Sequence, residues 1–495
     1  MRTAHSQQTR TPASRRTGRR HLLALSLVVA LVASLATVPG ASGSRGQTTL
    51  FDLGGVVLDM PQVQRTDLLN ELQDFGVDTV RVMATWRDFA PDPQSSNRPA
   101  FDATNPAAYP AANWVELDDL VRGARARGMD VLLTPSSPTP RWGSRTGSET
   151  ANPIPFHFGQ FAQALGTRYS GAYTPPASAT DPAPTVLPRV DKWSVYNEPN
   201  LTLFLRPQLR RGRSVAAKIY RRLFLAAQGG LRASGHGGDL LLIGETSPGP
   251  GRKGTDPIDF VRGVFCLNEK YKRKRGCKKI RADGWAQHPY DPFDAPFERP
   301  RKNLINLANI GKLTRALNKA RRARAVNRRL PIYVTEYGIE SVPDRKFGVS
   351  QLRQAEFISI SEYLMYRIGR IRSFGQYLMS DDAGNAQVNF QTGLRFSDGR
   401  NKVSYSAFPI ALVAQRRDKT RKKVTIWGHV RPRGAPFPVS VEINGGRVLR
   451  RISTNANGYF QFRTNFRKRR RYSATTVLPD GTQLTGPFVR VYTFK

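Results

Sequence analysis

The chain has very little cysteine. Its 495 residues include only two, Cys266 and Cys277, which excludes a disulfide-rich scaffold. No histidine lies near this pair, so a metal site built on it is disfavoured. We predict instead one local disulfide between the two cysteines.

The sequence is also short of acid. It has 37 Asp and Glu against 77 Lys and Arg, a formal net charge of +40. Such a field attracts polyanions and indicates partners, not a fold. An anionic cell-surface polymer or acidic polysaccharide is therefore a predicted partner. A specific nucleic-acid partner is not, because the chain contains no recognition helix, zinc finger or aromatic-basic RNA motif.

The first 43 residues contain no acid and are typical of a secretory signal peptide. Arginine pairs precede an almost wholly apolar run over 22–38, and small residues follow it. The run is shorter than the roughly 20 residues of a membrane-spanning helix, so an anchor is the weaker alternative. We expect a secreted protein with no transmembrane anchor after cleavage, with association with the cell wall and the choice between general and twin-arginine export left open. Loss of the six arginines lowers the formal charge from +40 to +34.

Residues 46–413 alternate short apolar runs with amphipathic stretches, and 39% of the whole chain is hydrophobic. Strands are predicted at 53–58, 79–83, 131–134, 190–195, 240–244, 282–286, 332–335 and 373–379. Helical patterns lie between them, for example over 66–75, 114–126 and 214–227, with Gly76, Gly128 and Gly229 as stops. Eight such units predict a (β/α)8 TIM barrel of the α/β class. An open doubly wound sheet is disfavoured, because no glycine-rich dinucleotide motif opens the first helix.

The pattern changes near residue 414. Residues 415–495 contain short alternating runs separated by Asn-Gly and Asp-Gly turns, which predict a small all-β sandwich of immunoglobulin-like type. This segment has 19 basic and 3 acidic side chains, so it is denser in positive charge than the barrel. We expect the module to bind an anionic surface or to aid substrate binding.

Two glutamates follow predicted strands at the C-terminal face of the barrel. The segment W-S-V-Y-N-E-P-N places Asn197 and Glu198 after the fourth strand, and I-Y-V-T-E-Y-G places Glu336 after the seventh. Active sites of TIM barrels lie at this face, and retaining glycoside cleavage needs two carboxyl groups about 5 Å apart. The structural alternatives are a capping Asn with a surface Glu, and a rim carboxylate in an ion pair.

With these motifs, residues 50–412 resemble the clan A glycoside hydrolases, the superfamily that includes families 5 and 39. The segments L-Q-D-F-G-V-D-T-V-R-V and F-Q-T-G-L-R-F-S-D-G-R strengthen the resemblance. It implies that Glu198 is the acid/base, Glu336 the nucleophile and Asn197 a ligand of the sugar 2-hydroxyl. The chain departs from family 5 in lacking a tryptophan after the eighth strand and a histidine after the third, so the sugar itself cannot be carried over.

The resemblance also implies contacts around the nucleophile. His288 and Tyr290, in A-Q-H-P-Y-D-P after the sixth strand, are candidates to hydrogen-bond Glu336 and bind the sugar. Arg81, on the second strand, matches an arginine aimed at the nucleophile in family 5. A donor beside Glu336 is expected to lower its pKa. A packed rim pair and a structural ion pair in the barrel are the alternatives for these residues.

Tryptophans in two loops are predicted substrate-binding platforms. Trp86 follows the second strand and Trp142 the third, and flat aromatic faces suit sugar rings. Glu245, Asp381 and Asp382 also follow strands and either bind hydroxyls or solvate the rim.

These features predict a secreted retaining glycoside hydrolase that cleaves O-glycosidic bonds of a poly- or oligosaccharide by double displacement. No metal or organic cofactor is implied, because two carboxylates suffice for this chemistry. The alternative is a catalytically inactive barrel that acts as a cell-wall or polyanion- and carbohydrate-binding protein.

Overall fold

The computed structural model describes residues 46–177, 182–251, 253–291, 295–300, 304–444 and 446–495. The predicted signal peptide lies outside these residues. Within the described ranges, no helix has both the length and the apolar character needed to cross a membrane.

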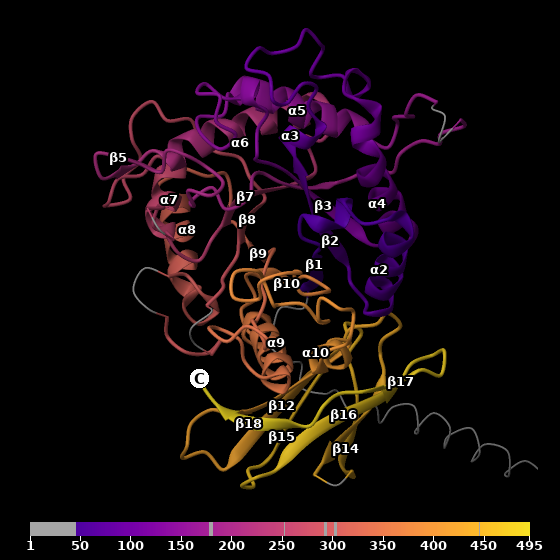
Figure 1. Ribbon diagram of the computed structural model, residues 1–495. Coiled ribbons are helices and arrows are strands. Elements are labelled where there is room, and N and C mark those ends of the chain that lie inside the picture. The colour runs from indigo at the N-terminus through magenta and orange to yellow at the C-terminus, as the bar shows by residue number, and fades with distance from the viewer. Residues whose placement is uncertain (1–45, 178–181, 252, 292–294, 301–303, 445) are drawn as a thin grey trace, which may run out of the picture. The chain divides into compact units, whose positions relative to one another are not determined.

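Parallel strands close into an eight-stranded barrel, which confirms the predicted fold class (Figure 1). The neighbour order around the barrel is β1-β10-β9-β8-β7-β4-β3-β2. These strands are β1 (Thr48–Asp52), β2 (Thr79–Thr85), β3 (Asp130–Ser136), β4 (Lys192–Ser194), β7 (Leu240–Thr246), β8 (Gly284–Gln287), β9 (Ile332–Val334) and β10 (Ile371–Tyr377). A short separate hairpin contains β5 (Leu209–Arg210) and β6 (Arg213–Ser214).

Helices surround the barrel (Figure 1). They are α2 (Gln62–Asp74), α3 (Trp86–Phe89), α4 (Val115–Ala126), α5 (Pro155–Arg168), α6 (Ala216–Ala233), α7 (Pro257–Val264), α8 (Gly311–Arg322), α9 (Gln351–Tyr366) and α10 (Val403–Ala407). Short 3-10 turns are η1 (Val56–Leu58), η2 (Pro106–Ala108), η3 (Ala111–Trp114), η4 (Arg141–Gly143) and η5 (Leu307–Asn309). Helical spacing of apolar residues explains their packing. In α4, for example, Leu117, Leu120, Val121 and Ala124 form one buried face.

The first strand lies earlier than the sequence predicts. β1 ends at Asp52, and the apolar residues 56–58 form the 3-10 turn η1 instead. Gly54 separates the two with a φ of +68°, a conformation that favours glycine and interrupts an extended strand. The predicted strand over 53–58 is therefore wrong, while the other seven overlap the observed barrel strands.

Helix α6 continues through the predicted stop at Gly229. It ends at Ala233, and the neighbouring Gly230 packs against α5. A Cβ atom on Gly230 would lie 2.1 Å from the Gly159 carbonyl oxygen. The glycines here allow two helices to approach closely.

A β-sheet region follows the barrel. Its strand order is β14-β13-β16-β18-β11-β12-β15, and β17 pairs with β16. The strands are β11 (Ile410–Arg416), β12 (Lys423–Val430), β13 (Pro438–Ile443), β14 (Arg447–Ser453), β15 (Tyr459–Asn465), β16 (Arg471–Val477), β17 (Gln483–Thr485) and β18 (Val489–Thr493). Alternate residues from these strands, including Leu412, Ile426 and Val441, share one apolar core. The predicted boundary at residues 413–415 falls inside β11.

The opposite face of β11 and β12 packs on α9 and is not exposed to solvent. Trp427 of β12 is fully buried, and its ring centroid lies 5.2 Å from that of Tyr363 and 5.4 Å from that of Tyr366. The Tyr363 hydroxyl donates to Gln415 Oε1 at 2.9 Å. Helix α9 is therefore buried by the barrel on one side and the sheet on the other.

Buried ion pairs reinforce this junction. Glu362 of α9 accepts from His429 Nδ1 at 2.6 Å and from the Arg431 guanidinium, and all three side chains are at most 7% exposed. Glu356, earlier in α9, is also buried and accepts from Nε of the half-exposed Arg490 at 3.1 Å. Both carboxylates lie on the barrel side and both sets of cations on the sheet side.

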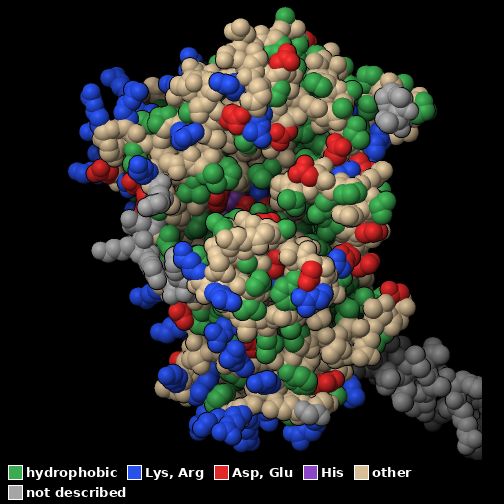
Figure 2. Space-filling model, in the orientation of Figure 1, with side chains coloured by type: hydrophobic (Ala, Val, Ile, Leu, Met, Phe, Trp, Pro, Cys, Tyr) green, Lys and Arg blue, Asp and Glu red, His purple; other side chains and the backbone are tan. Residues whose placement is uncertain are grey.

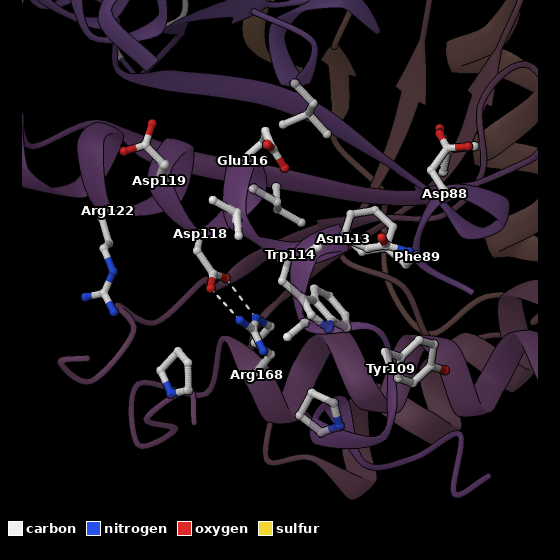
Figure 3. A pocket seen from close by; sticks show the side chains of 18 of the residues that line it. Asp88, Phe89, Tyr109, Asn113, Trp114, Glu116, Asp118, Asp119, Arg122 and Arg168 are labelled. Carbon is white, nitrogen blue, oxygen red and sulfur yellow. Dashed lines mark hydrogen bonds and ion pairs between the residues drawn. The ribbon is translucent and has the colours of Figure 1, made fainter. Parts of the chain in front are cut away.

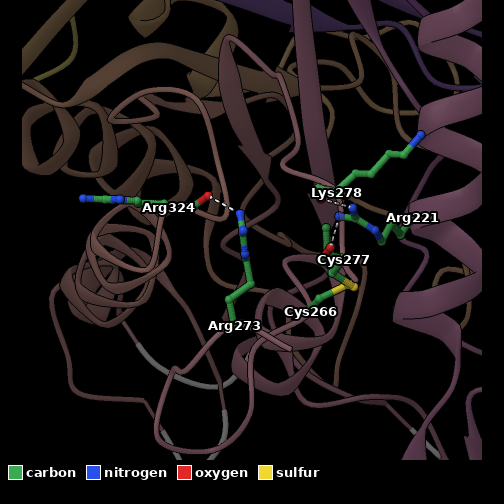
Figure 4. The surroundings of a disulfide bond; sticks show 7 residues. Arg221, Cys266, Arg273, Cys277, Lys278 and Arg324 are labelled. Atoms are coloured by element: carbon green, nitrogen blue, oxygen red, sulfur yellow. Dashed lines mark hydrogen bonds between the residues drawn. A yellow bond between two sulfur atoms is a disulfide. The ribbon is translucent and has the colours of Figure 1, made fainter. Parts of the chain in front are cut away.

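The predicted disulfide is confirmed. Cys266 and Cys277 are bonded, and close a loop after α7 (Figure 4). Arg273 in this loop donates to the Arg324 carbonyl oxygen at 2.8 Å, and Arg221 of α6 donates to the Lys278 carbonyl. The basic loop is thus attached to two neighbouring segments.

Replacing Glu362 by alanine should destabilise the protein strongly. Arg431 would keep its positive charge in a buried site without a counter-ion, at a cost of about 3–5 kcal/mol, and His429 would lose its hydrogen-bond partner. Urea and thermal unfolding of Glu362→Ala would measure this. Arg328→Ala is the control, because it breaks the exposed pair with Asp283 and should cost only about 0–1 kcal/mol. Equal losses in the two variants would contradict the structural role of Glu362.

Candidate active site

A buried arginine organises the C-terminal face of the barrel. Arg81 of β2 has no exposed surface. Its Nη1 donates to Asp52, at the end of β1, and lies 3.1 Å from Glu336 Oε2. Its Nη2 lies 2.7 Å from Asn197 Oδ1 and 3.4 Å from Glu245 Oε2. One guanidinium of β2 therefore links side chains from four other barrel strands or the segments that follow them.

The segment after β4 turns sharply to place Asn197 and Glu198. Tyr196 and Glu198 have φ angles of 69° and 37°, in the left-handed region that non-glycine residues rarely adopt. Packing holds this conformation, because Tyr196 is fully buried and the backbone N–H of Asn197 donates to Ser136 Oγ at 2.9 Å. Such backbone strain, of about 1–3 kcal/mol per residue, is typical of functional sites.

His288, directly after β8, lies between three carboxylates. Its Nδ1 is 3.1 Å from Glu198 Oε1 and 3.3 Å from Glu336 Oε2, and its Nε2 is 2.7 Å from Glu245 Oε2. Burial acts to lower the pKa of His288, but the charge of Glu336 and the hydrogen bonds to Glu198 and Glu245 raise it to about 10. The imidazole is therefore a cation that donates from both nitrogens.

Glu336 follows β9 and has three donors around it. Besides Arg81 and His288, the Tyr290 hydroxyl donates to its Oε1 at 2.9 Å. Side-chain oxygens of Glu198 and Glu336 lie within 4.8 Å of each other. The structure thus brings together the predicted residues Arg81, Asn197, Glu198, His288, Tyr290 and Glu336.

The predicted fall in the pKa of Glu336 is wrong in direction. Burial raises it to about 7, with Asp52 and Glu198 adding to the rise, while His288 and Arg81 only partly oppose it. Glu245 behaves differently. Burial acts to raise its pKa, but Arg81 and then His288 lower it to about 2.

One group among the described residues has the side-chain types of a metal site: Glu198, His288 and Glu336. Both ring nitrogens of His288 face carboxylate oxygens, so the imidazole is placed as a hydrogen-bond donor to them. The arrangement is suited to proton transfer and nucleophilic attack.

The predicted tryptophan platforms are not available to a sugar. Trp86 is fully buried and Trp142 is 4% exposed, with their rings packed edge to face. The indole N–H of Trp142 donates to the Pro91 carbonyl oxygen at 3.0 Å. Both side chains belong to the apolar layer under the loop after β2, so their expected role in stacking a sugar does not hold.

Two acids at the centre were not assigned from the sequence. The sequence does not point to Asp52, because it predicts a first strand that begins after this residue. For Glu245 it allows two roles, binding of substrate hydroxyls or solvation of the barrel rim. Glu245 is fully buried and also accepts from Thr335 Oγ1 at 2.7 Å. Asp381 is a structural residue, because it accepts a hydrogen bond from the buried Lys402 at 2.6 Å.

A groove of about 1060 Å³ lies at the first turns of α2 and α4 (Figure 3), and none of the residues of the carboxylate cluster is among its lining residues. It is lined by Met83 and Thr85 of β2, by the first turns of α2 and α4, and by aromatic side chains that include Trp114. Its charged lining residues are Asp59, Arg65, Asp88, Glu116, Asp118, Asp119, Arg122 and Arg168. Five acids against three arginines make this groove acidic in a strongly basic protein.

No protein-family model matches the chain, and no curated protein matches it. Solved structures do. A glucosidase from Croceicoccus marinus is 12% identical, with a TM-score of 0.50, over 86% of this chain and 94% of that one. A family 39 glycoside hydrolase from Bacteroides cellulosilyticus WH2 is 15% identical, with a TM-score of 0.49, over 88% and 82%. A family 39 β-xylosidase from Caulobacter crescentus is 17% identical, with a TM-score of 0.47, over 82% and 84%. The likeness to the glucosidase is one of fold, and at this level the resemblance is confirmed.

Imidazole NMR should find His288 charged at pH 8. Its raised pKa, about 10, keeps both ring nitrogens protonated, whereas His157, whose pKa is lowered by burial, should be neutral. In Glu245→Gln the pKa of His288 should fall, because a neutral amide replaces a carboxylate that favours the cation. Titration of His288 below His157 in the wild type would contradict the carboxylate cluster.

Proposed function

We propose that this protein is an exported retaining glycoside hydrolase that cleaves O-glycosidic bonds of a poly- or oligosaccharide. The observation that carries the proposal is the separation of Glu198 and Glu336, whose side-chain oxygens lie within 4.8 Å at the C-terminal face of the barrel. Retaining enzymes need about 5–5.5 Å between the two carboxyl groups, and inverting enzymes need room for a water between them.

Glu336 is the nucleophile in this proposal. It attacks the anomeric carbon while Glu198 gives its proton to the leaving oxygen, and Glu198 then deprotonates the water that releases the sugar. Donor geometry supports this order. Glu336 accepts from Tyr290 and Arg81 and lies near His288, so hydrogen bonds favour its charged form. Arg81 also orients the side-chain amide of Asn197 by donating to its Oδ1. The Nδ2 of this amide can then donate to a sugar hydroxyl.

The charge balance of the cluster supports one shared proton. Four carboxyl groups face two cations, because Asp52 and Glu245 surround Arg81 and His288 together with the catalytic pair. Full ionisation would leave two uncompensated negative charges in a buried site, which is costly. The raised pKa of Glu336, about 7, expresses this cost. The cluster therefore favours a state that keeps one proton over full ionisation.

Three further features support the finer parts of the proposal. The acidic groove includes Met83 and Thr85 of β2, the strand of Arg81, in its lining, and its volume is large enough for sugar units. The composition of residues 1–43 and the disulfide support export, since disulfides persist in oxidising compartments. The excess of basic residues in 415–495 supports retention at an anionic surface polymer.

Glutamine substitutions test the catalytic roles. On a panel of aryl glycosides and polysaccharides, Glu336→Gln should abolish turnover. Glu198→Gln should lower kcat/KM by about 10²- to 10⁴-fold on natural substrates and by less on aryl glycosides, whose leaving groups need little protonation. Glu340→Gln is the matched control. Its pKa is likewise raised to about 7 by burial, but it accepts from the Gln391 amide outside the cluster. No turnover by folded wild type on a broad panel would favour the catalytically inactive alternative.

The stereochemical outcome tests the mechanism separately. Proton NMR of the first product formed from an active substrate should show the anomeric configuration of the substrate, because a carboxylate is too close to admit an attacking water. Release of the inverted anomer would refute double displacement even if both glutamates proved essential.

A further inference from the structure

Three loops meet at one end of the C-terminal sheet region. We call their described residues together the basic end: 417–423, 444, 446–447 and 466–471. Strand register joins the first and third loops, because Lys423 of β12 pairs with Asn465 of β15. The Asn444 side chain joins the second to the third, since its Nδ2 donates to the Arg469 carbonyl oxygen at 3.1 Å. Segments up to 54 positions apart in sequence thus form one surface.

The basic end has an extreme charge. It contains eleven Lys and Arg residues: Arg417, Lys419, Arg421, Lys422, Lys423, Arg447, Arg467, Lys468, Arg469, Arg470 and Arg471. Its single acid, Asp418, lies 3.3 Å from Arg421 and offsets one of them. Figure 2 shows Lys and Arg side chains gathered over this part of the molecule. Like charges this close repel one another, and a polyanion that displaces their counter-ions relieves the repulsion.

Protection of a sheet edge explains only part of this charge. β14 is an edge strand, and arginines along it prevent pairing with another chain. Lys419, Lys422 and Lys468 lie in loops, where no strand edge needs protection, and all three are exposed. These lysines therefore call for another explanation.

We propose that the basic end binds an acidic polysaccharide, a sugar chain with a carboxylate on its repeating units. Nucleic acid fits less well. Phe466 is the single aromatic residue in the basic end, and the Arg416 guanidinium covers its ring at 4.1 Å from the centroid. An open ring for base stacking is therefore missing from the described residues of this surface. The further idea that binding holds the enzyme on material bearing its substrate rests on the proposed function.

Matched lysine substitutions test the site. Binding of the full chain carrying Glu336→Gln, so that no polymer is consumed, is measured on immobilised polygalacturonate across a salt series. Log K should fall linearly with log salt concentration. Adding Lys419→Gln, Lys422→Gln and Lys468→Gln should weaken binding at least tenfold at low salt and reduce the slope by up to about 1 per lost contact.

The control removes the same charge elsewhere. Lys270, Lys272 and Lys274 are exposed lysines of the disulfide loop, and their change to glutamine should leave binding within twofold. Equal weakening in both triple variants, a flat salt response, or tighter patch-dependent binding of single-stranded DNA would overturn the proposal. Unchanged melting temperatures confirm that both variants fold. An inactive wild type would refute the proposed hydrolysis but leave this binding result intact.

Discussion

The charge of Arg81 inside the barrel is the constraint on which the rest of the site depends. A guanidinium without exposed surface is tolerated only with carboxylate partners, and here it has Asp52, Glu245 and Glu336. These partners come from β1, β7 and the end of β9, so pairing the arginine fixes the relative positions of distant strands. His288 then joins Glu245 to Glu198 and Glu336. The geometry of Glu198 and Glu336 follows from this buried network.

Strand ends made much of the site predictable. In a parallel barrel every strand ends at the same face, so polar residues directly after strands converge however far apart they lie in sequence. Glu198, His288 and Glu336 were found in this way. The same logic missed Asp52, because an apolar run at 56–58 looked like the first strand. That run is a 3-10 turn, and the true strand places Asp52 at the face beside Arg81.

Two predictions were wrong for a related reason: the lowered pKa of Glu336 and the sugar-stacking role of the tryptophans. In both cases the reason is burial. Motifs identify the donors around Glu336 but not how completely water is removed from it. Desolvation outweighs His288 and Arg81, so the pKa rises. Trp86 and Trp142 follow strands as the polar residues do, yet they turn into the apolar layer. Position after a strand predicts which face a residue reaches, whereas exposure depends on packing between distant segments.

The C-terminal region shows the same limit on a larger scale. Alternating runs predicted the strands of this region but not what covers their second face, and β11 and β12 are buried on both faces. The second face meets α9, where Glu356 and Glu362 accept from cations of the sheet. Detaching the sheet would leave these carboxylates uncompensated and expose Tyr363 and Tyr366. The barrel and the sheet therefore stabilise each other.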